Sequence, residues 1–245
     1  MGEGSALIIM HGVFGSGDNW QTLGRKWSEN YQVHLLDMRN HGKSPHSDEF
    51  SYELMSDDLL QYLDEHKISK ALLLGHSMGG KVGMLFSVLN PERVEKLVVA
   101  DIAPKPYKPH HQKIIEALQS LDLENLNSRG EAEEAFEIED EGTRQFLLKS
   151  LYWKEKGRLA WRFNVEVIAR EVGKVGEPLP PNAIFRGETL FVRGGNSWYI
   201  QDEDEANIQE HFPEAKLDTI EGAGHWLHAE KPSEFKEVVD NFLKG

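Results

Sequence analysis

The pentapeptide Gly75-His76-Ser77-Met78-Gly79 carries the clearest chemical signal in this sequence. It follows the apolar run Ala71–Leu74 and precedes a run typical of a buried helix, so it lies on a predicted strand-to-helix turn. Such a turn holds a serine in a strained conformation with its hydroxyl exposed, and the flanking glycines avoid collisions with neighbouring backbone. The pattern predicts that Ser77 is a nucleophile.

A serine hydroxyl needs a base to remove its proton. His225 lies in Gly222-Ala223-Gly224-His225-Trp226, after the last predicted strand and before the last predicted helix. The small residues beside it allow a loop to bring the imidazole over the serine, so we expect His225 to be the general base. His228 is the alternative, for which we favour a structural role. No third ligand motif accompanies this histidine pair, and we expect no metal site.

The base in turn needs an acid to orient it, and the chain order expected for such a turn is serine, acid, histidine. The corner where the acid usually lies, Arg193–Trp198, contains no carboxylate. Asp101 ends an earlier strand, at the edge of the sheet where catalytic groups gather. Asp202 is the second candidate, although it begins an acidic run typical of a first helical turn. We therefore predict Asp101 as the acid.

Backbone N–H groups are expected to bind the oxyanion. Met78, the residue after the nucleophile, should supply one, and the loop His11–Gly15 after the first strand should supply the other. We favour Val13 as that donor; Phe14 is the alternative, unless its ring points into the pocket. The loop matches no phosphate-binding motif, and we expect no cofactor.

Five aromatic residues are candidates for lining a substrate pocket. Phe14, Tyr199 and Trp226 lie near the predicted catalytic centre. Trp153 and Trp161 lie in the middle of the chain, where they either line an acyl pocket or form the core of their own segment.

Six short β-type runs alternate with amphipathic helical patterns, which indicates a doubly wound, mostly parallel α/β sheet. The runs are Ala6–Met10, Val33–Asp37, Ala71–Gly75, Lys96–Ala100, Thr189–Val192 and Lys216–Ile220. Residues 104–186 interrupt the alternation with helical patterns, including one over 159–172, and no convincing strand. Their large apolar side chains argue against a disordered loop. We expect a core of residues 1–103 and 187–245 with a helical cap of residues 104–186 inserted in it.

Composition limits the partners. Acidic residues outnumber basic ones 41 to 27, giving a formal charge of −14, which disfavours nucleic acid and anionic membranes as partners. The chain has no cysteine, which excludes disulfides and thiolate nucleophiles. No signal peptide or membrane span is predicted, and a cytoplasmic protein is the default expectation. A basic run, Lys105–Lys113, either attracts an anionic leaving group such as coenzyme A or is an ordinary solvated loop.

The chain resembles the α/β-hydrolases, and more narrowly the YbfF-type esterases. The resemblance rests on six segments: residues 11–16, 37–46, 75–81, 101–104, 193–200 and 222–228. It implies hydrolysis of carboxylic esters, with acyl-CoA thioesters as a further substrate class, and it places the acid at Asp101. The two strands that often precede the His-Gly loop in α/β-hydrolases are absent here. We therefore expect a shortened sheet with one exposed edge that favours pairing between chains, and a monomer or a homodimer.

The sequence thus predicts a serine esterase or thioesterase that acts on a small-molecule acyl donor through an acyl-enzyme. One alternative is another α/β-hydrolase chemistry: C–C bond hydrolysis, lactone opening or perhydrolysis. The other is a ligand-binding or sensor protein that keeps the triad but turns over slowly.

Overall fold

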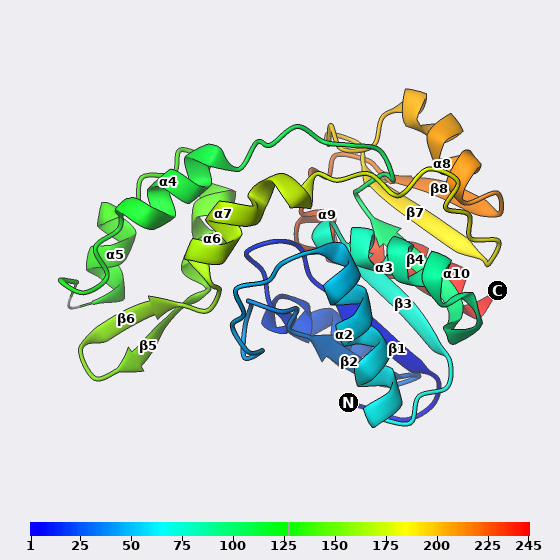
Figure 1. Cartoon of the computed structure of the whole chain (residues 1–245), viewed down its shortest axis with the longest axis horizontal. Coiled ribbons are helices and arrows are strands. Elements are labelled where there is room, and N and C mark those ends of the chain that lie inside the picture. The colour runs from blue at the N-terminus through cyan, green and yellow to red at the C-terminus, as the bar shows by residue number, and fades with distance from the viewer. Residues whose placement is uncertain (127) are drawn as a thin grey trace.

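Six parallel strands form the centre of the protein in the computed structural model, which describes residues 1–126 and 128–245 (Figure 1). Their order across the sheet is β2-β1-β3-β4-β7-β8. The strands are β1 (Ala6–Met10), β2 (Gln32–Leu36), β3 (Ala71–His76), β4 (Val94–Ala100), β7 (Thr189–Gly194) and β8 (Ala215–Ile220). The central strands β1, β3, β4 and β7 are mostly apolar and buried because helices cover both faces of the sheet. The predicted fold class is confirmed.

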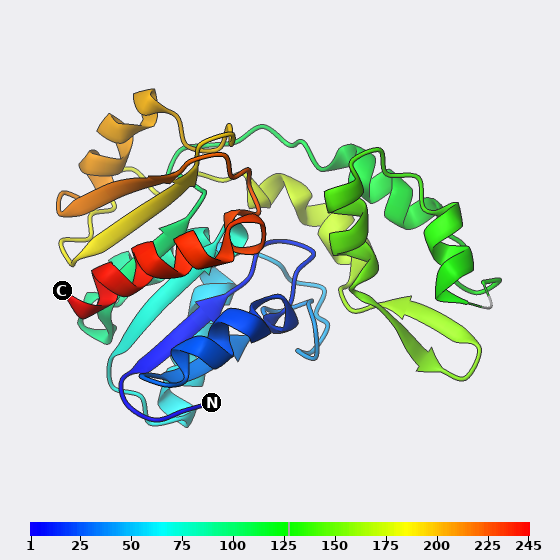
Figure 2. The ribbon, with the colours of Figure 1, turned by 180° about the vertical axis from the view of Figure 1, so that it is seen from behind.

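The two helical layers are visible from opposite sides (Figures 1 and 2). One face packs against α2 (Tyr52–Glu65), α3 (Met78–Leu89) and α8 (Glu205–His211), and the other against α1 (Gln21–Trp27) and α10 (Pro232–Lys244). Side chains of β1 alternate between the two: Ile8 belongs to the first layer and Leu7 to the second. Short turns of helix complete the core: η1 (Gly17–Trp20), η2 (Pro91–Arg93), η3 (Asp202–Asp204) and α9 (Leu227–Glu230).

The segment between β4 and β7 extends to one side of the sheet (Figure 2). We call residues 104–186 the cap segment. It contains α4 (Gln112–Ser120), α5 (Arg129–Ala135), α6 (Glu141–Leu148), β5 (Leu151–Glu155), β6 (Arg158–Trp161) and α7 (Val165–Val175).

The cap segment is not purely helical, so that part of the sequence prediction is wrong. β5 and β6 form an antiparallel hairpin, and the helix predicted over residues 159–172 is instead a strand followed by α7. Gly157, with φ +79°, supplies the left-handed residue at the hairpin turn. Leu151 pairs with Trp161 and Trp153 with Leu159 across the hairpin, which gathers the large apolar side chains on one face.

β2 lies at an edge of the sheet, where the sequence predicts a shortened sheet with one exposed edge. The backbone of Met1 lies against the outer side of this strand and exchanges two hydrogen bonds with Val33, at 2.7 and 2.8 Å. The edge is therefore covered at one residue, and pairing of chains through it stays a prediction. Among the described residues, no helix has the length and apolar character needed to cross a membrane.

Candidate active site

Ser77 lies on a tight turn between β3 and α3, with φ 52° and ψ −117°. A left-handed backbone of this kind is unusual for a residue other than glycine and indicates local strain. Glycine is required on both sides: a Cβ on Gly75 would lie 2.2 Å from the Gly79 oxygen, and one on Gly79 would lie 2.4 Å from the Met10 oxygen. The turn is therefore built by the close approach of β1, β3 and α3, as the motif predicts.

Asp101 and His225 meet in space although 124 residues separate them in sequence. Asp101 follows β4, His225 lies between β8 and α9, and the His225 Nδ1 is 2.8 Å from the Asp101 Oδ2. Asp101 is fully buried and adopts a left-handed backbone conformation, with φ 51°. Its carboxylate also accepts hydrogen bonds from the Gly194 amide, at 3.0 Å, and from the Ser197 hydroxyl. Three donors thus fix this carboxylate.

Burial is the largest influence on the titration of this pair. It lowers the pKa of His225, and the neighbouring His110 lowers it further. It raises the pKa of the Asp101 carboxyl, while the hydrogen bonds from Ser197 and Gly194 oppose that shift. A lowered pKa keeps the imidazole neutral near neutral pH, and only the neutral ring accepts a proton.

The His225 ring is also held by aromatic neighbours. Tyr199 stacks on it with ring centroids 3.8 Å apart and an angle of 14° between the planes. His76 donates a hydrogen bond from Nε2 to the His225 carbonyl oxygen, at 2.8 Å. His228, the alternative base, is buried and stacks on Trp20 at 4.1 Å instead. The geometry therefore favours His225 over His228.

The alternative acid is engaged elsewhere. Asp202 forms an ion pair with Arg193, whose Nη1 is 2.6 Å from its Oδ1, and its side chain is 86% exposed. The basic run after Asp101 is also partly engaged, because Lys105 forms an ion pair with Asp204 at 2.5 Å. Lys105 is thus directed to a carboxylate of the chain itself.

Two backbone N–H groups near Ser77 are candidates for the oxyanion site. Among the described residues, the amides of Val13 and Met78 donate to no other group, and Met78 begins α3. The Phe14 amide, the alternative donor, already donates to the His41 Nε2 at 3.2 Å. The geometry therefore favours Val13, as the sequence predicts.

A cavity of about 200 Å³ opens beside Ser77 and His225. Phe14, Tyr199 and Trp226 line it, together with Phe146 and Leu147 of α6. Trp153 and Trp161 do not. Trp153 is 44% exposed on the hairpin, and Trp161 stacks on Phe163 at 5.6 Å within the cap segment. The prediction that these two tryptophans line the pocket is therefore wrong for this cavity, because Trp153 is largely exposed and Trp161 packs inside the cap segment.

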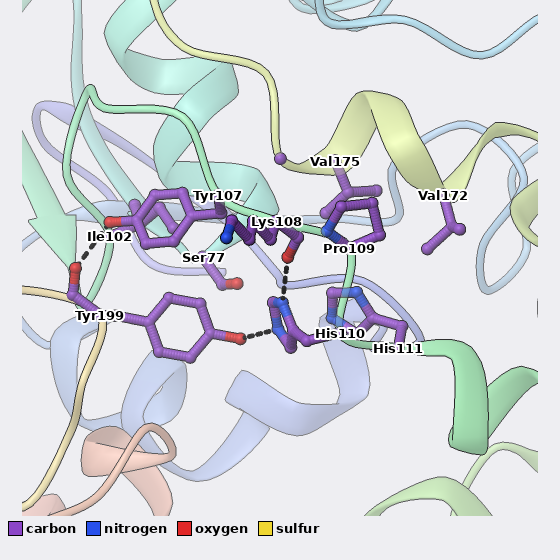
Figure 3. A pocket seen from close by; sticks show the side chains of 11 residues that line it. Ser77, Ile102, Tyr107, Lys108, Pro109, His110, His111, Val172, Val175 and Tyr199 are labelled. Carbon is purple, nitrogen blue, oxygen red and sulfur yellow. Dashed lines mark hydrogen bonds between the residues drawn. The ribbon is translucent and has the colours of Figure 1, made fainter.

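A much narrower space of about 10 Å³ also touches Ser77 (Figure 3). The Tyr199 hydroxyl lies 2.5 Å from the His110 Nε2, and both residues line this space as well as the larger cavity. The His110 Nδ1 donates to the Lys108 carbonyl oxygen at 3.0 Å, which leaves Nε2 to accept a hydrogen bond from the Tyr199 hydroxyl. The Tyr199–His110 pair thus borders both spaces at the nucleophile (Figure 3).

Sequence reasoning missed two residues that position the site. Ser197 donates a hydrogen bond to Asp101 from the corner Arg193–Trp198, and the absence of a carboxylate at that corner is the sequence signal for a different polar role there. His41 receives the Phe14 amide and donates from Nδ1 to the Arg39 carbonyl oxygen, at 2.9 Å. The position of His41 in the loop after the second strand is typical of a residue that holds a loop together by hydrogen bonds, but its partner lies 27 residues away and does not follow from that pattern.

Comparison with known proteins agrees with this arrangement. A family model described as alpha/beta hydrolase fold matches residues 5–232. The strand order, the turn at Ser77 and this match define the class, and the chain belongs to the alpha/beta hydrolase fold family.

Individual relatives are esterases and lipases. The chain is 36% identical over 244 residues to esterase YbfF of Escherichia coli, covering 98% of this chain and 93% of that protein. It is 36% identical over 248 residues to the mouse sn-1-specific diacylglycerol lipase ABHD11, covering 97% of this chain and 80% of that protein. A solved structure of a marine microorganism esterase is 40% identical, with a TM-score of 0.95 and coverage of 98% and 96%. The predicted resemblance is confirmed, and these matches indicate a carboxylic ester hydrolase.

Proposed function

We propose that the protein hydrolyses small carboxylic esters through an acyl-enzyme formed on Ser77. The observation that carries the proposal is the 2.8 Å contact between His225 and a buried Asp101 at the cavity that Ser77 lines. An imidazole oriented by a carboxylate beside a strained serine that lines a cavity is the arrangement that activates a hydroxyl for acyl transfer.

In the proposed reaction the Ser77 Oγ attacks the ester carbonyl carbon while His225 Nε2 takes the hydroxyl proton. The Val13 and Met78 amides stabilise the negative charge on the carbonyl oxygen. The C–O bond then breaks, and the alcohol leaves with the proton from His225. Water repeats the sequence on the acyl-enzyme, giving its proton to His225 and releasing the carboxylic acid and Ser77.

Among the described residues, no hydrogen bond joins the Ser77 hydroxyl to His225. Catalytic hydrogen bonds often tighten only when substrate is bound. A small rotation of the Ser77 side chain at the cavity supplies the missing contact in this proposal.

The cavity favours esters with a small or medium-sized apolar group. Its volume is about 200 Å³, and aromatic and aliphatic side chains dominate its lining. We propose that residues 104–186 act as a cap, because α6 supplies one wall of this cavity through Thr143, Phe146 and Leu147.

A fluorophosphonate probe combined with substrate turnover tests the proposal. We expect one covalent adduct at Ser77, located by peptide mass spectrometry, and turnover of p-nitrophenyl esters that a folded Ser77→Ala variant loses. Unchanged turnover by Ser77→Ala would falsify the assignment. Labelling without multiple turnover on any ester or acyl-CoA would instead favour a sensor, and faster thioester than ester turnover would redefine the substrate class.

A further inference from the structure

Lys81 is a buried lysine that the proposed reaction does not use. It lies on α3 one turn after Ser77, its backbone amide donates to the Ser77 carbonyl oxygen, and its residue is 1% exposed. Fully buried lysines are rare unless they are paired with an acid. Among the described residues, no carboxylate lies within ion-pair distance of the Lys81 Nζ.

Two backbone carbonyls take the place of the missing acid. The Lys81 Nζ donates to the Lys105 oxygen at 2.7 Å and to the Glu177 oxygen at 2.8 Å. Lys105 follows β4 and Glu177 precedes β7, so one side chain of the core holds both connections between the sheet and the cap segment. The ring of Tyr107 lies 5.2 Å from the same Nζ.

The two connections also bind each other at this point. The Tyr107 amide donates to the Gly176 oxygen at 2.8 Å, and the Leu179 amide donates to the Pro104 oxygen at 2.9 Å. Their approach is close, because a Cβ on Gly176 would lie 2.2 Å from the Tyr107 oxygen. We call these two paired segments, residues 104–111 and 175–179, the hinge. The Lys81 amine therefore holds the hinge against α3.

The same hinge carries side chains that surround the nucleophile. Tyr107, His110 and His111 from the first connection and Val175 from the second line the narrow space at Ser77 (Figure 3). The Tyr107 hydroxyl accepts from the Ala103 amide and donates to the Tyr199 oxygen, at 2.8 and 2.6 Å, which ties the hinge to the loop after β7. Movement of the hinge would therefore displace the residues that border the reacting ester.

We propose that Lys81 is a positioning residue: it fastens both connections of the cap segment to the nucleophile helix and so fixes the cap over Ser77. The expected effect of Lys81 on kinetics rests on the proposed function, whereas its expected effect on the stability of the two connections does not depend on activity. Burial and the charge of nearby Lys105 lower the pKa of Lys81 to about 7. Deprotonation of Lys81 does not break the two hydrogen bonds, because an uncharged amine still has two N–H groups for the two carbonyl oxygens.

Amide hydrogen exchange of the whole protein tests the structural part. We expect Lys81→Met, which keeps the length and apolar stem but has no donor, to accelerate exchange of the Tyr107 and Leu179 amides by about tenfold or more. Lys81→Arg, which keeps donors, should restore at least half of that protection. Wild-type exchange in Lys81→Met overturns the proposal, and so does a failure of Lys81→Arg to restore protection, because the effect then belongs to packing.

Lys96 offers a matched control. It is also a buried lysine, and its Nζ donates to the Phe242 oxygen at 3.0 Å and lies 5.2 Å from the Phe242 ring. It also pairs with the Glu188 Oε2 at 3.4 Å, so both of its partners lie outside residues 104–186. Lys96→Met should leave exchange of Tyr107 and Leu179 unchanged. If it accelerates these amides as much as Lys81→Met does, the effect is global destabilisation and the proposal is wrong.

Kinetics with p-nitrophenyl butyrate test the functional part. We expect Lys81→Met to raise KM about fivefold or more while kcat changes less than twofold, because loosening the cap weakens substrate placement and leaves Asp101 and His225 intact. A fivefold or larger fall in kcat with unchanged KM contradicts a positioning role. If the wild type shows no serine-dependent turnover at all, the proposed function fails, while the exchange experiment still decides whether Lys81 fastens the hinge.

Discussion

The two sides of the cavity at Ser77 are held in different ways. On the core side, Asp101 is fixed by three hydrogen-bond donors and by a left-handed backbone, and His225 is fixed by Asp101 and the Tyr199 ring. On the cap side, α6 contributes Phe146 and Leu147, which are held by apolar packing. Hydrogen bonds fix direction, whereas packing fixes mainly volume. Under the proposed function, we infer from this difference that the core determines the chemistry and the cap segment determines which ester fits.

The largest effect is expected from Asp101→Asn on the core side. An amide at this position holds His225 in the wrong tautomer or leaves its Nδ1 proton poorly stabilised, so kcat should fall about 10³- to 10⁴-fold with little change in KM. Steady-state kinetics on p-nitrophenyl butyrate and circular dichroism of the variant measure this.

Asp202→Asn is the control for that experiment. Asp202 is exposed and paired with Arg193, so its variant should keep wild-type kcat. A large loss in Asp202→Asn with a small loss in Asp101→Asn would show that the acid is wrongly assigned.

A second effect concerns acid stability and depends on neutral histidines buried in the core. Four such histidines, outside the Asp101–His225 pair, have lowered pKa values through burial. They are His11 (about 4), His41 (about 3), His76 and His228. The Nε2 atoms of His11 and His41 each accept a hydrogen bond from a backbone amide, which requires a neutral ring. In the cap segment, His111 has a pKa lowered to about 3 for the same main reason.

The sign follows from linkage. Unfolded histidines bind a proton below about pH 6.5, whereas these folded ones stay neutral, so their stabilisation is complete above pH 6.5 and falls as pH decreases. Each group changes the unfolding free energy by up to about 1.4 kcal/mol per pH unit in this window. Asp101, whose pKa is raised, acts in the opposite direction and offsets His225.

Urea unfolding between pH 7.5 and 5 measures this dependence. We expect a midpoint that falls steadily below pH 6.5, where ordinary carboxylates with pKa near 4 are still ionised. His41→Gln should reduce the pH dependence of the unfolding free energy by the contribution of about one proton. A midpoint independent of pH in this window would contradict the proposed neutral core.

The same contrast explains what the sequence could and could not predict. β1 matches its predicted bounds. The turn at Ser77 and the position of Asp101 follow from local patterns, because each residue comes directly after an apolar strand, at the edge of the sheet where polar groups are expected. Ser197 and His41 act through partners distant in sequence, so local patterns indicate at most a polar role and not the group that each one contacts. In the cap segment the hairpin of β5 and β6 has only four paired positions and charged residues at its turn. Its second strand also overlaps the helical pattern over residues 159–172, so the sequence pattern favoured a helix there.

The smallest expected effect is on the cap side, and it decides whether the cap selects the ester. Phe146 lines the cavity and packs on Trp226 with ring centroids 4.0 Å apart. Phe146→Ala removes apolar surface that a longer acyl group would contact, so KM for p-nitrophenyl octanoate should rise about tenfold, while kcat and the kinetics on p-nitrophenyl acetate change about twofold or less.

Trp153→Ala, at an exposed aromatic residue of the same segment that does not line the cavity, should match the wild type on both esters. A loss of kcat on both esters in Phe146→Ala would mean that α6 also orients the catalytic groups, and the division between a chemical core and a selective cap would then be wrong.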